Sequence, residues 1–103
     1  MMQYQLVLQW PASSIDDYDA MIETENLLID SLPKGSEIDG HDAGSGEVNI
    51  FMRTDDPRRT FETVKLTLES HGRFAGVRVG YRNVEATKYS VLWSEGLEAF
   101  KVS

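Results

Sequence analysis

The stretch EVNIFMRTDDP at residues 47–57 joins a strand pattern to the start of a helix. Its apolar side chains Val48, Ile50 and Met52 occupy every second position, which is typical of a strand with one buried face. The Asp-Asp-Pro that ends the stretch supplies an acidic N-cap followed by proline at the first helical position. The stretch therefore predicts a strand that leads directly into a helix.

The sequence on either side extends this unit. Upstream, residues 37–42 form a second candidate strand, and the Gly-rich residues 43–46 predict a tight turn, so that the two strands pair as a hairpin. Downstream, the predicted helix buries a stripe of apolar side chains and ends at His71 and Gly72. That stripe consists of Phe61, Val64 and Leu68.

The N-terminal segment repeats the strand-then-helix pattern. Residues 3–10 alternate up to Pro11, which predicts a half-buried strand. Ser14 then precedes a helix with an acidic first turn, which closes at Pro33 and Gly35. The residues expected to face the core are Tyr4, Leu6, Leu8 and Trp10 of the strand, and Ile15, Tyr18, Met21, Ile22, Leu28, Ile29 and Leu32 of the helix and its end.

Two further strands are expected near the C-terminus, over residues 74–82 and 88–93. The complete order is β-α-β-β-α-β with one extra C-terminal strand, which is the split βαβ pattern of the ferredoxin-like fold, or α-β plait. In that α+β fold, both helices cover one face of an antiparallel sheet. We expect residues 1–103 to form a single ferredoxin-like domain, because no repeat, linker or low-complexity segment interrupts the pattern.

Charge is distributed unevenly along the 103-residue chain, whose formal net charge is −7. Residues 1–56 carry 12 acidic and 2 basic side chains, whereas residues 57–103 carry 5 acidic and 8 basic ones. An acidic surface disfavours nucleic acid and anionic membranes, because phosphate binding needs clustered Lys and Arg. The chain has no cysteine, which excludes disulfides and fits a cytoplasmic protein. No apolar run is long enough to span a bilayer.

Alternation also defines the sheet face that points away from the helices. It is expected to carry Gly76 and Gly80, which weaken a strand, beside Val7 and Phe51, which a solvated face does not need. We therefore expect this face to bind a second copy of the chain in a homodimer, with a merely solvated face as the alternative. One aromatic side chain and an acidic total fall short of an RNA-binding platform. The predicted binding residues are Asp39, His41, Glu47, Asn49, Phe51, Arg53, Arg78 and Arg82.

The densest polar cluster lies in the predicted hairpin. Asp39 and His41 are two residues apart, so on a strand they share a face, and Glu47 returns across the turn. A histidine with carboxylates could hold a divalent metal or act as a base, although one histidine without cysteine is a weak ligand set. The alternative is an acidic hairpin whose side chains satisfy turn amides. No motif calls for a cofactor, and the Gly-Ser-Gly turn lacks the pattern of a phosphate loop or a nucleophilic serine.

The first predicted helix provides another candidate surface. It carries six acidic side chains at spacings that place several of them on its outer face, and such a surface favours a basic protein partner. The alternative is that these acids only keep the protein soluble. The six are Asp16, Asp17, Asp19, Glu23, Glu25 and Asp30.

Four motifs are spread over most of the chain: DGHD at residues 39–42, GSGEVNIF at 44–51, TDDP at 54–57 and YSVLW at 89–93. Together they resemble a group of small bacterial proteins without an assigned activity. The resemblance implies no catalytic residue. In size and acidity, the chain also resembles small immunity proteins that neutralise basic toxins.

The sequence as a whole favours a non-enzymatic interaction or ligand-binding module, expected as a homodimer. Two alternatives stay open: a small enzyme that uses the Asp39, His41 and Glu47 cluster, and an immunity-type inhibitor of a basic toxin.

Overall fold

The computed structural model describes residues 3–12, 14–93, 97 and 99–102. In chain order its elements are β1 (Tyr4–Pro11), α1 (Ile15–Ile29), β2 (Ser36–Gly44), β3 (Glu47–Thr54), α2 (Pro57–Ser70), β4 (Arg78–Asn83) and β5 (Ser90–Trp93). The strands form one antiparallel sheet in the order β2-β3-β1-β4-β5. This α+β order is consistent with the predicted ferredoxin-like arrangement.

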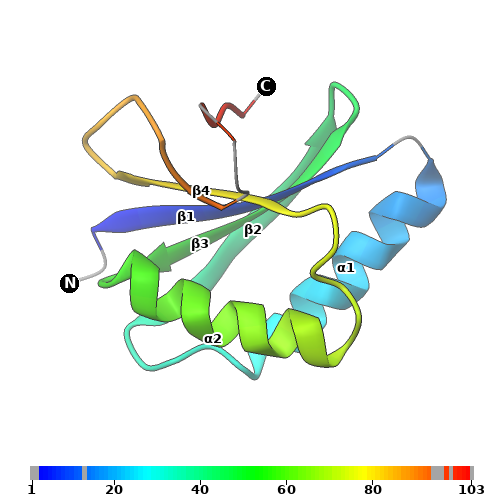
Figure 1. Ribbon diagram of the computed structural model, residues 1–103, viewed down its shortest axis with the longest axis horizontal. Helices are drawn as coiled ribbons and strands as arrows, with labels where there is room; N and C mark the ends of the chain where they lie inside the picture. The colour runs from blue at the N-terminus through cyan, green and yellow to red at the C-terminus, as the bar shows by residue number, and fades with distance from the viewer. Residues whose placement is uncertain (1–2, 13, 94–96, 98, 103) are drawn as a thin grey trace.

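Both helices lie on one side of the sheet, and the C-terminal segment, of which residues 97 and 99–102 are described, lies on the opposite side (Figure 1). β1 is the central strand and pairs with β3 along its whole length and with β4 on its other edge. In this register, Leu8 lies between Ile50 of β3 and Val79 of β4. All three point toward the helices, as the alternation in the sequence predicts.

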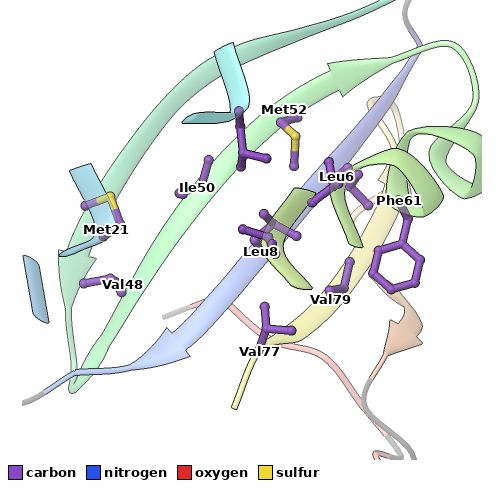
Figure 2. Close-up of a cluster of buried hydrophobic side chains, with 12 residues drawn as sticks. Leu6, Leu8, Met21, Val48, Ile50, Met52, Phe61, Val77 and Val79 are labelled. Atoms are coloured by element: carbon purple, nitrogen blue, oxygen red, sulfur yellow. The ribbon is translucent and has the colours of Figure 1, made fainter. Parts of the chain in front are cut away.

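The hydrophobic core fills the space between the sheet and the two helices, and Figure 2 shows the side chains that the strands direct into it. Burial removes these apolar groups from water, which is the main favourable contribution to folding. The predicted inward faces of β1 and β3 are confirmed. The buried cluster consists of Leu6, Leu8, Met21, Leu28, Val48, Ile50, Met52, Phe61, Val64, Leu68, Val77 and Val79.

Local sequence accounts for the helix ends. Ser14 and Asp56 cap α1 and α2 with side-chain oxygens that accept first-turn amides, as predicted. α2 ends at Ser70 with His71 as its C-cap, and the next residue, Gly72, has a φ of +67° that lets the Arg73 amide donate to the carbonyl of Leu68 at 2.8 Å. These contacts satisfy backbone groups that a helix end would otherwise leave without partners.

The predicted inward face of α1 is confirmed except at Ile29, and the side chain of Ile15 lies outside the described part of the structure. Ile29 is 54% exposed and is the last residue of the helix, whereas Met21, Leu28 and the polar Thr24 are buried. Tyr18 and Ile22 pack against the core at its border, whereas Ile29 at the end of the helix lies beyond the sheet-facing stripe.

β4 begins at Arg78, later than the predicted start at residue 74. Gly76 lies in a turn before the strand with φ of +77°, so the prediction that it lies on the sheet face is wrong. The pairing of β4 with β1 ends at Gln9, so Trp10 and Pro11 have no paired strand residue on that edge. β5 likewise begins at residue 90 instead of 88.

Candidate functional site

The predicted cluster of Asp39, His41 and Glu47 is separated in the structure. β2 contains a bulge between Ile38 and Gly40, which leaves Asp39 as an extra residue. The bulge puts Asp39 and His41 on opposite faces of the sheet, so the prediction that they share a face is wrong. Among the described residues, no group of three or more His, Asp or Glu side chains is arranged to hold a metal ion.

Each member of that cluster has a different partner. Asp39 Oδ2 accepts a hydrogen bond from Arg53 Nε at 3.3 Å on the exposed surface. Glu47 Oε2 accepts one from Arg78 at 2.6 Å. His41 lies on the helix side of the sheet, because its backbone position is opposite Ile50. The carboxylates therefore pair with arginines, and His41 alone reaches toward α1.

His41 contacts two residues of α1 that the sequence did not connect with it. Its Nδ1 lies 3.0 Å from Oε2 of Glu25, and its Nε2 lies 3.3 Å from the hydroxyl of Tyr18. The rings of Tyr18 and His41 meet edge to face at 6.0 Å. Tyr18 and Glu25 are seven residues apart and thus share a helix face. The bulge that turns His41 toward them has no recognisable pattern in the sequence, so the contact could not be predicted. The cluster links α1 to the edge strand.

Removing the Glu25 carboxylate tests that link. We expect Glu25→Gln to lower the free energy of unfolding by about 0.5–1.5 kcal/mol, because a hydrogen bond at a mostly covered site is lost or weakened. The Glu25 side chain is only 13% exposed, whereas Asp19 on the outer face is exposed. Asp19→Asn is the matched control and should change stability less. Urea unfolding measures both, and equal values for the two variants would contradict the assignment.

The other predicted binding residues lie on the sheet face opposite the helices, but several are engaged by their own chain. Asn49 is buried, accepts a hydrogen bond from Gln9 at 3.0 Å and donates to Asp42 at 2.8 Å. Gln9 also donates to the carbonyl of Lys101 at 2.9 Å. Phe51 on the same face is half-buried. This polar row therefore holds the C-terminal segment onto the sheet.

Arg82 also has an internal role. Its guanidinium donates to Gln5 at 3.1 Å and to the carbonyls of Val84 and Ala86 at 3.0 and 2.8 Å. It also lies 5.7 Å from the ring centroid of Tyr89. Arg82 thus orders the loop between β4 and β5.

The described C-terminal residues 99–102 lie on this side of the sheet (Figure 1), where Phe100 contacts β4 and Lys101 contacts β1. Phe100 packs directly on Gly80, at a position where a β-carbon would collide with its ring. The Phe100 ring also meets Tyr89 edge to face at 5.3 Å. Phe100 and Val7 are both buried. Gly80 is therefore required for a close approach of the chain's own tail, which accounts for a glycine in a central part of the sheet.

The acidic face of α1 is narrower than predicted. Glu25 turns toward His41, and Asp17 lines a pocket on the inner side of the helix. The remaining four carboxylates are spaced 3, 4 and 7 residues apart, which places them on one exposed stripe about 20 Å long. We call this the acidic stripe; it consists of Asp16, Asp19, Glu23 and Asp30.

The acidic stripe is only partly explained by helix stability. Asp16 lies in the first turn, where a carboxylate favours the helix, but Asp30 is the C-cap, where the helix dipole disfavours it. Within the described residues, only Glu23 of the four forms an ion pair, with Arg73 at 3.0 Å. At Asp16, Asp19 and Asp30 the stripe therefore presents negative charge that no ion pair among the described residues compensates.

A pocket of about 210 Å³ opens between α1 and the end of β1. Its apolar wall is formed by side chains of both elements and of β3, and its polar groups come from α1 and from Arg73. The lining consists of Trp10, Pro11, Asp17, Ala20, Met21, Thr24, Val48, Arg73 and Ala75. No local pattern in the sequence predicts this pocket, because its lining residues are spread between positions 10 and 75.

The fold is that of an α+β protein with two helices on one side of a five-stranded antiparallel sheet, and its described part contains no helix long and apolar enough to cross a membrane. The chain matches no protein-family model, no curated protein and no solved structure. The resemblance to a group of small bacterial proteins therefore stays a prediction.

Proposed function

We propose that this protein is a non-enzymatic interaction module that binds a basic protein segment on the outer surface of α1. The observation that carries the proposal is the acidic stripe, four exposed carboxylates along one helix face with the pocket beside Trp10 at its side. Clustered charge of one sign accelerates association with partners of the opposite sign. An immunity-type inhibitor of a basic toxin is one protein that would use such a surface.

The side chains on the sheet face opposite the helices are largely engaged by their own chain, which supports α1 as the binding surface. Arg78 and Arg82 hold groups of their own chain, and the buried Asn49 belongs to the row that fastens the C-terminal segment. A partner would have to displace these contacts, whereas the acidic stripe is exposed. The ferredoxin-like domain would then act as a rigid support for α1.

The alternative of a small enzyme has less support. It was based on Asp39, His41 and Glu47 acting together, and these three side chains make separate contacts with Arg53, Glu25 and Arg78. General acid–base catalysis needs groups within hydrogen-bond reach of one reacting atom. The distribution of these residues favours a binding role over catalysis.

The predicted homodimer stays a prediction. A second copy would meet a sheet face whose middle holds the C-terminal segment, so it would bind over β2 and β3 or displace that segment. Light scattering at high micromolar concentration measures the mass in solution. A mass of one chain under those conditions would overturn the homodimer and leave the α1 surface unaffected.

Binding of a polyarginine peptide tests the acidic stripe. We expect Asp16→Asn, Asp19→Asn and Asp30→Asn together to weaken binding about 10-fold, because each exposed charge pair contributes about 0.2–1 kcal/mol. Calorimetric or fluorescence titration measures the dissociation constant. Binding should also weaken as salt rises, since the Debye length falls from about 10 Å at 0.1 M to about 3 Å at 1 M.

A matched triple variant distinguishes the effect of where the carboxylates lie from the effect of the change in net charge. Glu62→Gln, Glu69→Gln and Glu85→Gln remove three exposed carboxylates elsewhere and change the formal net charge equally. We expect this variant to keep most of the affinity for the peptide. Equal weakening in the two triple variants would show that net charge alone matters, and it would contradict the proposal.

A further inference from the structure

A groove of about 550 Å³ lies between the second half of α1 and the end of α2, and we call it the interhelical groove. It adjoins the C-terminal end of the acidic stripe, because Glu23 and Asp30 belong to both. Binding pockets usually have volumes of about 300–1,000 Å³, so the groove can admit a long side chain of another molecule. Its lining consists of Glu23, Asn26, Leu27, Asp30, His71 and Arg73.

The C-terminal ends of both helices meet at the interhelical groove. Asp30 is the C-cap of α1, His71 is the C-cap of α2, and both side chains line the groove. A helix C-terminus carries a partial negative charge equivalent to about half an elementary charge. A lysine or arginine in the last turn often compensates this charge, but neither α1 nor α2 has a basic residue there. The groove therefore combines two negative helix ends.

Asp30 adds a full negative charge, and the described part of the chain provides no ion pair for it. The other carboxylate of the groove is occupied, because Glu23 accepts a hydrogen bond from Arg73 at 3.0 Å. The same guanidinium donates to the carbonyl of Ala20 and the hydroxyl of Thr24, both at 3.2 Å, so it is held against α1. Glu23 thus compensates the arginine of the lining, and the charge of Asp30 remains.

Uncharged groups of the lining can accept hydrogen bonds or cover a side chain. His71 Nδ1 lies 2.9 Å from the carbonyl oxygen of Thr67, which can only accept, so Nδ1 carries the proton. In the neutral ring, Nε2 is then an acceptor, and the exposed amide of Asn26 provides another. Leu27 is half-buried and supplies an apolar surface for a methylene stem.

From these observations we infer that the interhelical groove receives a cationic side chain, lysine or arginine, of the basic partner. The inference rests on the proposed function and names the place on the acidic stripe where the partner inserts a side chain. The ammonium or guanidinium group donates to the Asp30 carboxylate, and its methylene stem lies on Leu27. The bound cation takes the place of the basic residue that both last turns lack.

Titration with N-acetyl-lysinamide tests the groove without a partner protein. In a proton–nitrogen NMR spectrum, the side-chain amide of Asn26 and the backbone amide of His71 should shift and saturate. The side-chain amide of Asn83 is an internal reference and should stay in place, because Asn83 lies on β4 and accepts a hydrogen bond from the Glu85 amide at 3.0 Å. N-acetyl-argininamide should saturate the same resonances. N-acetyl-norleucinamide, which has the lysine stem without its charge, should cause no saturating shift.

Two carboxylates at opposite ends of the acidic stripe give a matched pair of variants. Asp30→Asn should weaken binding of N-acetyl-lysinamide about 5-fold, which is the upper range for an exposed charge pair. Asp16→Asn changes the net charge equally but does not line the groove, so it should change the affinity by less than about 2-fold.

A second pair of variants tests the shape of the groove without a change of charge. Asn26→Phe narrows the groove and should also weaken binding of N-acetyl-lysinamide, followed at the backbone amide of His71. Leu66→Phe is the control, because it places a ring at an exposed position of α2 that does not line the groove. This control should leave the affinity unchanged.

The outcomes separate this inference from the proposed function. The inference would be overturned by equal effects of Asp30→Asn and Asp16→Asn, by full binding to Asn26→Phe, by saturation with N-acetyl-norleucinamide, or by no saturation with either cationic probe. If the polyarginine peptide still depends on the acidic stripe, the proposed function survives that result. If N-acetyl-lysinamide saturates the groove but the peptide binds the two triple variants equally, the inference about the groove is supported and the proposed function is overturned.

Discussion

Replacing Leu8 with alanine is expected to lower the free energy of unfolding by about 2–5 kcal/mol. Leu8 is fully buried in the central strand and lies between Ile50 and Val79 (Figure 2). Its loss removes apolar contacts on both sides and leaves a cavity that the paired strands cannot close. Urea unfolding followed by far-ultraviolet circular dichroism measures the change.

Leu66→Ala is the control for this prediction. Leu66 lies on α2 and is 66% exposed, so the same chemical change should alter stability by about 0.5 kcal/mol or less. A Leu8→Ala variant as stable as Leu66→Ala would show that the inward face of β1 is assigned to the wrong side.

The contact between Phe100 and Gly80 gives the second large effect. Phe100 is 5% exposed, and we expect Phe100→Ala to lower the free energy of unfolding by about 3 kcal/mol. This value is at the low end for a buried phenylalanine, because the C-terminal segment can detach while the rest of the sheet stays paired. Amide exchange should then increase near Gly80 and Gln9, which the segment contacts.

Gly80→Ala probes the same contact from the sheet. A β-carbon at this position collides with the Phe100 ring, so the single variant should lose about 1–3 kcal/mol of stability. In the Phe100→Ala background the ring is absent, and Gly80→Ala should then be nearly neutral. The double-mutant cycle measures this coupling by denaturant unfolding. Additive effects would mean that the C-terminal segment does not lie on Gly80.

Much of the fold followed from patterns that local physics imposes. The alternation of Leu6 and Leu8 in β1 and of Ile50 and Met52 in β3 identified their buried faces correctly. Ser14 and Asp56 marked the helix starts, because a side-chain oxygen at these positions satisfies amides of the first turn. The turn between β2 and β3 also followed, since Ser45 and Gly46 both adopt positive φ, as a two-residue hairpin requires.

The candidate sites were predicted less well, because alternation assumes an unbroken strand. One bulge residue, Asp39, reversed the face of His41 and separated the expected cluster. His41 then met Glu25, which helical spacing alone would have left on the acidic surface. Alternation also gave no indication that the chain's own tail occupies part of the sheet face, where Phe100 packs on Gly80 and the Lys101 carbonyl accepts a hydrogen bond from Gln9.

The sequence by itself determined the order of the elements, the inward faces of the main strands and the excess of acid in the first half of the chain. These depend on spacing over a few residues or on composition. Only the tertiary structure decided which carboxylates form the acidic stripe, where the C-terminal segment lies, and that a pocket opens beside Trp10. These features depend on contacts between distant residues. Gln9 and Lys101, for example, are joined by a hydrogen bond although they are 92 positions apart in the chain. No local pattern encodes such a contact, because it forms only when the packed core brings the two segments together.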